Sequence, residues 1–379
     1  KVHPKDKFTW YVIAASGNAW KTTNAGTTWT PVFQNEKTYS IGQVVIDPKN
    51  PNTVWVGTGE SNNQRSVGFG DGVYRSDDGG KSWKNVGLEK SEHIGRIVID
   101  PRDSNVVYVA AVGPLWSAGG DRGLYKTTDR GKTWKKILEI SENTGVTDVA
   151  VDPKNPDIVL AAAHQRRRHV WSQIHGGPES ALYRSTDAGA TFNKVSIARG
   201  DLGRIGFAFS PAQRGLVYAR VEATENGGFY ASTDSGASWD KRDSYAGLPM
   251  YYANVHPDPN VADRVYFMDV FVRVSDDGGR TWRQVGERNK HVDNHYYWID
   301  PDNSDHIING CDGGVYETWD RGALWRHLNN LSITQFYNVD VDNASPIYNI
   351  YGGTQDNSTL GGPSRTLGAG GGTNPDWFI

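Results

Sequence analysis

The acidic side chains that lie outside a repeated turn motif are the first residues to consider for chemistry. The candidates among them are Glu60, Asp71, Asp293, Asp312 and Asp356. Glycoside hydrolysis needs two carboxyl groups, about 5–5.5 Å apart for retention of configuration or about 6.5–9.5 Å apart for inversion. Each of these residues is alternatively a turn or salt-bridge residue, and the spacing along the chain leaves the distances open. We predict Glu60, Asp293, Asp312 and Asp356 as the catalytic candidates.

The segment His291-x-Asp293-x-His295 places two imidazoles and a carboxylate at alternate positions. In an extended strand these three side chains share one face. They would then suit a Zn²⁺ site, a general acid–base group, or a polar network that fixes a link between repeats. No further metal ligand stands close to them in the sequence. We therefore predict no metal and no other cofactor, and we expect His291 and His295 to contact a ligand.

Positively charged side chains gather in the irregular parts of the chain. Arg65 lies in a long loop, Arg166 opens an Arg-Arg-Arg run, and Arg96 and Arg204 each follow a glycine. If they converge they form an anion site, because guanidinium groups bind carboxylate, sulfate or phosphate through paired N–H donors. The alternative is a solvated loop and salt bridges between repeats. Trp116, in another long loop, offers an aromatic ring that could stack on sugars or peptide side chains. The predicted ligand-binding residues are Arg65, Arg96, Trp116, Arg166, Arg204, His291, His295 and Gln355.

One octapeptide pattern, Ser/Thr-x-Asp/Asn-x-Gly-x-Ser/Thr-Trp, recurs seven times along the chain. Its copies span 22–29, 76–83, 127–134, 185–192, 232–239, 275–282 and 318–325, with Phe192 replacing one Trp and Leu324 one hydroxyl residue. The Asp or Asn side chain closes a turn by accepting backbone N–H groups, and the Gly supplies a positive φ. We therefore interpret the seven Asp or Asn positions as structural and not as catalytic.

Each octapeptide is flanked by alternating apolar runs that predict four short strands. In the second repeat these runs are 44–46, 53–57, 72–76 and 83–86. Period-2 alternation between turn residues is typical of strands, and four strands in about 50 residues make one propeller blade. The predicted fold class is an all-β propeller of about seven four-stranded blades. We assign residues 1–335 to it, and 336–379 to a further blade or a link toward a second propeller of a longer chain.

The octapeptide resembles the Asp-box, or BNR repeat, of sialidases, xyloglucan-degrading glycosidases and sortilin-type sorting receptors. The whole chain also resembles large bacterial proteins described as sortilin-like, VPS10-domain or BNR-repeat glycosyl hydrolases. The residues that carry this resemblance are 56–60, 65–66, 70–74, 165–168, 291–295 and 351–357. The resemblance implies an exported propeller that is extracellular, on the cell surface or periplasmic. It implies no single activity, because one fold hosts many functions.

The two faces of such a propeller differ in regularity. With strands A to D counted outward from the axis, the octapeptide turns and the A–B turns lie on one face. The B–C loops and the links between blades lie on the other, and their lengths vary. Long B–C loops near 60–71, 113–122 and 164–180, together with the segment after Gln355, predict a cleft on this irregular face. We expect the candidate residues to line it, because binding residues are concentrated in loops on a rigid scaffold.

Composition excludes several classes of protein. The 379 residues carry 40 Lys+Arg and 43 Asp+Glu, a net charge of −3, which argues against a nucleic acid partner. No apolar run reaches the roughly 20 residues of a membrane span, and the single cysteine, Cys311, allows no internal disulfide. The arginines and Tyr296 show no ordered match to sialidase motifs. We predict a recognition or scaffold propeller that binds a peptide, protein or glycan beside further domains of the same polypeptide, with a glycoside hydrolase as the alternative.

Overall fold

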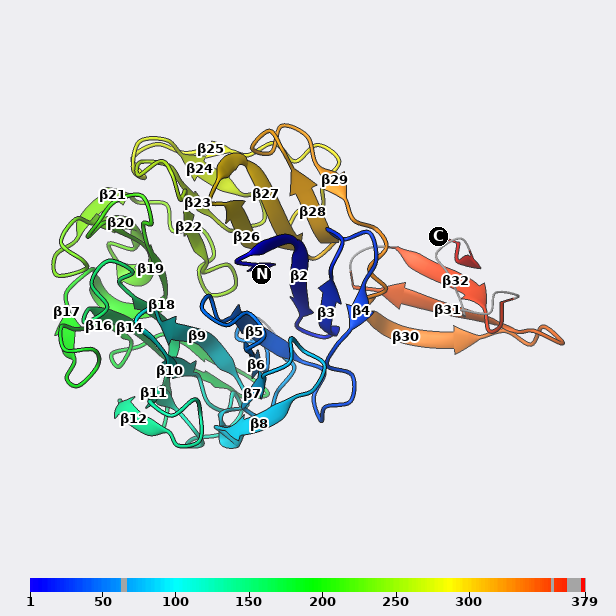
Figure 1. Ribbon diagram of the computed structural model, residues 1–379, viewed down its shortest axis with the longest axis horizontal. Helices are drawn as coiled ribbons and strands as arrows, with labels where there is room; N and C mark the ends of the chain where they lie inside the picture. The colour runs from blue at the N-terminus through cyan, green and yellow to red at the C-terminus, as the bar shows by residue number, and fades with distance from the viewer. Residues whose placement is uncertain (63–66, 356–357, 367–375, 379) are drawn as a thin grey trace.

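The computed structural model describes residues 1–62, 67–355, 358–366 and 376–378. Within these ranges the strands form eight antiparallel sheets, and the first seven are arranged in a ring about a central axis (Figure 1). The predicted all-β propeller of about seven blades is confirmed. A short 3₁₀ turn, η1 (Glu89–Ser91), joins blades two and three. No helix in the described residues has the length and apolar character needed to cross a membrane.

The blades follow one another in chain order, each with its strands in sequence from the axis outward. Blades one to three contain β1 (Val2–His3), β2 (Asp6–Ala14), β3 (Asn18–Thr22), β4 (Thr30–Pro31); β5 (Ile41–Ile46), β6 (Val54–Thr58), β7 (Val73–Ser76), β8 (Lys84–Gly87); and β9 (Ile94–Asp100), β10 (Asp103–Ala111), β11 (Gly123–Thr127), β12 (Lys135–Leu138). Blades four and five contain β13 (Thr144–Val151), β14 (Val159–Arg168), β15 (Gln173–His175), β16 (Ala181–Ser185), β17 (Asn193–Val195); and β18 (Arg199–Phe209), β19 (Val217–Glu225), β20 (Gly228–Ser232), β21 (Asp240–Asp243). Blades six and seven contain β22 (Val255–Pro257), β23 (Val265–Phe267), β24 (Arg273–Ser275), β25 (Arg283–Gln284); and β26 (Asn294–Asp300), β27 (Asn303–Cys311), β28 (Gly314–Thr318), β29 (Arg326–His327).

The hydrophobic core is divided among the interfaces between neighbouring blades. One cluster joins blades four and five through Leu160, Leu182, Phe207 and Val221, all of them buried. A blade buries both faces in this way, and the alternation of its strands supplies apolar residues to both sides. The blades are therefore held at fixed positions, and loops at their ends are positioned by a rigid frame.

The seven octapeptide turns have nearly the same hydrogen bonds. In the sixth turn, the Ser275 hydroxyl donates to Asp277 Oδ1 at 2.7 Å and accepts from the Gly279 N–H at 2.7 Å. The Asp277 carboxylate then accepts from the Thr281 N–H at 2.9 Å and the Thr281 hydroxyl at 2.6 Å. The seventh turn lacks the last bond because Leu324 has no hydroxyl, and Asp320 accepts only the Leu324 N–H at 3.0 Å from that residue. These contacts support the structural interpretation of the acidic positions.

The aromatic residue of the turn packs against the preceding blade. The indole N–H groups of Trp83, Trp134 and Trp325 donate to the carbonyls of Val32, Val86 and Gly286 at 2.6, 2.7 and 2.8 Å. Each Trp thus buries its ring and satisfies its one donor at the same time. The turns therefore connect adjacent blades as well as adjacent strands.

The ring closes between blades seven and one without a shared strand. Lys7 of blade one binds Asp300 of blade seven at 2.8 Å, and Trp29 Nε1 donates to Asn330 Oδ1 at 3.1 Å. Beneath these polar contacts, Trp10 packs against Val315 and Leu328. Closure thus depends on side chains.

A three-stranded sheet follows the ring and lies outside it (Figure 1). It contains β30 (Phe336–Val341), β31 (Asn349–Thr354) and β32 (Thr359–Pro363). The side chains of Tyr337 and Val339 on its edge strand are 62% and 57% exposed, although they are apolar or aromatic. This sheet occupies the region predicted to start a further blade or a link.

Candidate functional site

The loop after β6 reaches from blade two toward the inner strands of the blades opposite. The Glu60 N–H donates to Gly68 O at 2.9 Å and to Ser40 Oγ at 3.1 Å, which holds the start of the loop. Arg166 Nη1 of blade four donates to Ser61 O at 3.3 Å, and Arg204 Nη1 of blade five donates to Asn62 Oδ1 at 3.2 Å. Residues of three blades therefore meet on the irregular face near the ring axis, a place that we call the channel mouth.

Two of the predicted carboxylates lie in this region. His295 Nε2 of blade seven is 2.8 Å from Asp312 Oδ1, and both side chains are about one quarter exposed or less, at 26% and 21%. Burial raises the pKa of Glu60 above its ordinary value, and the negative charge of Asp312 raises it further; the charge of His295, a hydrogen bond from Asn62 and the charge of Arg166 oppose the shift. Glu60 and Asp312 thus influence one another although they belong to blades two and seven.

Asp293 is bound to a tyrosine that the sequence did not single out. The Tyr252 hydroxyl donates to Asp293 Oδ1 at 2.6 Å. The rings of Tyr251 and Tyr252 lie against the His295 imidazole, with centroids 5.2 and 5.3 Å away. Burial, followed by the hydrogen bond to Asp293, raises the pKa of Tyr252. Two aromatic rings therefore line the acidic region.

The expectation that His291, Asp293 and His295 share one face of a strand is wrong. Asp293 has a left-handed backbone, with φ of 61°, and β26 begins only at Asn294. His291 instead places Nδ1 2.9 Å from Val292 O. Among the described residues, no group of three His, Cys, Asp or Glu side chains has the arrangement of a metal site.

Arg96 binds protein groups through its Nε and Nη2 atoms. Its Nε and Nη2 atoms bind the two Asp148 carboxylate oxygens at 2.8 and 3.3 Å, which makes a salt bridge between blades three and four. Nη2 also donates to Asn254 Oδ1 at 3.2 Å, and Asn254 Nδ2 donates to His295 O at 2.8 Å. A Cβ on Gly95 would overlap the Thr147 carbonyl, so glycine permits this close approach of the inner strands. Arg96 therefore forms a salt bridge between blades, which was the alternative to an anion site.

Arg166 is part of a strand and not of a loop. The predicted loop of blade four near 164–180 is wrong in its first part, because β14 continues to Arg168 and pairs with β15. Arg166 is completely buried, at 0% exposure, so it is not the solvated residue of the alternative interpretation. Burial lowers its pKa to about 9, the charges of Arg204 and Arg122 add to that effect, and Glu60 and Glu92 oppose it.

The remaining predicted residues lie apart from this mouth or outside the described ranges. Trp116 is 48% exposed in the B–C loop of blade three. Gln355 follows β31 in the sheet outside the ring, and its N–H donates to Gln335 O at 3.0 Å. Arg65 and Asp356 are outside the residues that the structure describes.

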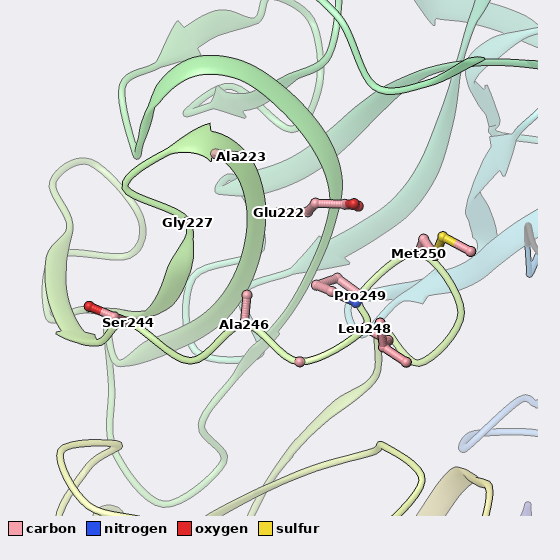
Figure 2. A pocket seen from close by; sticks show the side chains of 9 residues that line it. Glu222, Ala223, Gly227, Ser244, Ala246, Leu248, Pro249 and Met250 are labelled. Carbon is pink, nitrogen blue, oxygen red and sulfur yellow. The ribbon is translucent and has the colours of Figure 1, made fainter. Parts of the chain in front are cut away.

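Two cavities flank the link between blades five and six, residues 244–250. The smaller, about 290 Å³, is lined by Glu222, Pro249 and Met250 among others, and Figure 2 shows the Glu222 carboxylate reaching toward the side of Met250. The larger, about 500 Å³, is lined by Tyr245 and Asp269 among others. The sequence did not lead us to predict these residues. The link that contains Tyr245 departs from the repeat, and this departure could have indicated them.

Residues that line the cavity next to Glu222 contact Arg204, which also binds the loop after β6. Glu222 Oε2 lies 2.7 Å from His175 Nε2 and accepts the Arg204 N–H at 3.1 Å. Arg204 Nη1 also donates to Met250 O at 2.9 Å. The link itself is held by Arg220, which is fully buried, donates to Ala246 O and binds Asp269 at 2.8 Å. The smaller cavity is thus joined by hydrogen bonds to Arg204, and the larger is joined to Arg220 through the Asp269 carboxylate.

The chain is similar to xyloglucanases. Xyloglucanase Xgh74A of Acetivibrio thermocellus is 25% identical over 315 residues, which are 73% of this chain and 36% of that protein. A xyloglucanase of Hypocrea jecorina is 24% identical over 251 residues, 59% of this chain and 28% of that protein. A probable oligoxyloglucan-reducing end-specific xyloglucanase of Neosartorya fischeri is 30% identical over 113 residues, 28% of this chain and 12% of that protein. The chain thus spans about a third or less of the length of these curated relatives.

Two solved structures and one family model extend the comparison. An ancestral GH74 enzyme superimposes with a TM-score of 0.57 at 16% identity, over 100% of this chain and 55% of that one. YCF48 bound to D1 peptide gives a TM-score of 0.53 at 15% identity, over 83% of this chain and 90% of that one. At such identities these structures show the propeller fold alone. The Sortilin-Vps10 model (sortilin, neurotensin receptor 3) matches residues 71–176, in blades two to four.

Proposed function

We propose that the protein is a glycoside hydrolase, the alternative of the sequence analysis, with Glu60 and Asp312 as its two carboxyl groups. The observation that carries the proposal is the burial of Glu60 on the segment that Arg166 and Arg204 hold, where burial and the charge of Asp312 raise the pKa of Glu60. A raised pKa keeps a carboxylic acid protonated near neutral pH, as a general acid requires. The similarity to xyloglucanases supports a glycan substrate.

In this proposal Glu60 donates its proton to the glycosidic oxygen as the bond from that oxygen to the anomeric carbon breaks. Asp312 acts at the anomeric carbon, either directly or by taking a proton from the attacking water. Water supplies the hydroxyl group of one product, and its remaining proton restores Glu60. His295, 2.8 Å from Asp312, orients the carboxylate, and the rings of Tyr251 and Tyr252 offer apolar faces to a sugar.

The test is the hydrolysis of xyloglucan by Glu60→Gln, which keeps the shape of the side chain and removes its acidic proton. We expect the rate to fall by about 10²- to 10⁴-fold with binding retained. Glu36→Gln is the matched control, because burial also raises the pKa of Glu36 but that residue lies in the link between β4 and β5. Absence of hydrolysis by the unaltered protein across a panel of polysaccharides would reject the proposal.

A second candidate is the recognition or scaffold propeller of the sequence analysis. The match to the Sortilin-Vps10 model includes the loop of Trp116, and a peptide is named with the YCF48 structure. Peptide binding that is lost in Trp116→Ala, without hydrolysis of any glycan, would favour this function. The exposed edge strand β30 suits a further domain of the polypeptide, and an extracellular, surface or periplasmic location suits either function.

A further inference from the structure

Arg166 carries donors that no described residue satisfies. The side chain is completely buried, yet its Nε and Nη2 atoms have no acceptor among the described residues. Within the described ranges Nη1 alone is bonded, to Ser61 O at 3.3 Å, a long contact for this type of bond. Buried guanidinium groups are normally paired, because an unpaired buried charge is costly.

One imidazole beside Arg166 shares this property. His164 precedes Arg166 by two positions on β14, so both side chains project from the same face of the strand. His164 is 1% exposed, and neither of its ring nitrogens has a partner in the described part of the chain. His93 is also 1% exposed, but its ring bonds the Glu60 backbone, so the unpartnered Nδ1 of the neutral ring is an acceptor and not a donor. Burial lowers the pKa of His164 well below its ordinary value, and the charges of His175 and Arg166 add to that effect, so this ring is neutral and carries one N–H donor.

The segment Gly59–Asn62 of blade two lies against Arg166. A Cβ on Gly59 would overlap the backbone of Glu92 and His93, which places the start of the segment directly against His93. Ser61 and Asn62 then contact Arg166 and Arg204. Arg166, with its unpartnered donors among the described residues, therefore contacts the segment that also carries Glu60.

The neighbouring charges leave a positive balance at this point. The charges of Arg204 and Arg122 both act on Arg166, and Arg122 uses its own donors elsewhere: its Nε and Nη1 bind the Gly119 and Val112 carbonyls at 2.9 and 3.0 Å. Glu60 and Glu92 also act on Arg166, but no hydrogen bond joins either of them to it among the described residues. The donors of this cluster thus face a surplus of positive charge.

We propose that Arg166 and His164 bind a small monovalent anion, chloride or the carboxylate of a small acid, beside the Gly59–Asn62 segment. The anion accepts from Arg166 Nε and Nη2 and from an imidazole N–H, and its charge offsets the repulsion among the arginines. Bound there, it stabilises the loop position that brings Glu60 to the channel mouth. The site depends on burial and unpaired donors, so it stands independently of the proposed hydrolase activity.

Crystals soaked in sodium bromide give the direct test, because bromide replaces chloride and scatters anomalously. We expect a peak within hydrogen-bond distance of Arg166 Nε and Nη2. Density at that point that is only water, in crystals soaked in bromide and in formate, would overturn the proposal. A formate ion there without bromide would identify the ligand as a carboxylate.

Thermal unfolding gives a test in solution. At constant ionic strength, chloride, bromide and formate are compared with gluconate, which is too large for a buried site. We expect the first group to raise Tm by about 2–4 °C as the anion passes from one to a hundred times its dissociation constant. Arg166→Met removes the donors and abolishes the shift, whereas Arg167→Met, the next residue on β14, retains it. No shift in the unaltered protein, or an equal shift in both variants, would contradict the site; if Arg166→Met does not fold, the bromide soak decides.

Discussion

The two faces of the propeller use the same kinds of polar residue in opposite ways. On the octapeptide face, Asp277 has its oxygens saturated by Ser275 and Thr281, and the same contacts recur from blade to blade. On the irregular face, Arg166 has unpartnered donors among the described residues and Glu60 has a raised pKa. Saturated groups stabilise a fold, and unsaturated or strained groups can act on a ligand. The comparison predicts that substitutions on the octapeptide face change stability, whereas substitutions on the irregular face change activity.

Asp312→Asn should show the largest effect on the irregular face. If Asp312 is the second carboxylate, hydrolysis falls by about 10³-fold or more, because a nucleophile or base is lost while the amide keeps the contact with His295. The free energy of unfolding should change little. Asp302→Asn, at an exposed position that binds Lys7 on the octapeptide face, is the control and should leave hydrolysis unchanged.

The pH dependence of hydrolysis should report the ionisation of the Glu60 carboxyl group. Because its pKa is raised, the protonated form persists above the range of an ordinary Glu, and activity falls as pH rises through that pKa. The fall approaches about tenfold per pH unit once most of Glu60 is ionised. Glu36→Gln should keep this limb of the profile; a limb that stays in place after loss of the Glu60 carboxyl would assign the proton to another group.

Asp277→Ala, on the octapeptide face, should lower the stability of the protein and leave hydrolysis unchanged. Losing the turn contacts should cost about 1 kcal/mol of unfolding free energy, measured in urea, with hydrolysis unchanged. Although desolvation opposes the shift, hydrogen bonds from Thr281 and Ser275 lower the pKa of Asp277 to about 2. Its folded pKa is lower than its unfolded one, so this stability is present above pH 4 and is lost as pH falls toward 2. An equal unfolding curve for both proteins at pH 7 would contradict the structural role.

Leu324→Thr should give the smallest effect and the opposite sign. Thr supplies the hydroxyl that the other turns donate to Asp, and Leu324 is 53% exposed, so little apolar burial is lost. We expect a gain of a few tenths of a kcal/mol in urea unfolding. Leu324→Val, which is branched but has no hydroxyl, is the control and should show no gain.

The fold was predictable from the sequence because its signals are local. Ser275, Asp277, Gly279 and Thr281 lie within seven residues, so the turn and the flanking strands can be recognised from one segment. The site was predictable only in part. Glu60 and Asp312 were named, but their approach depends on the ring bringing blades two and seven together.

The errors in the site have physical causes that the local pattern does not contain. The left-handed backbone of Asp293 breaks the expected alternation of His291 and His295. Arg166 looks like a solvated loop residue, but the pairing of β14 with β15 extends the strand and buries it. Tyr252 was missed because its role follows from contact with Asp293 across a blade boundary.

The closure of the ring by side chains has a consequence for the order in which the molecule is made. Lys7 and Asp300 are 293 positions apart, and Trp29 and Asn330 are 301 apart. A ribosome delivers blade one first, so Trp10 has no Val315 or Leu328 to cover it until nearly all of the ring has been synthesised. Through most of translation the molecule is therefore an open arc with an uncovered apolar end, and chaperone demand should fall only when blade seven emerges.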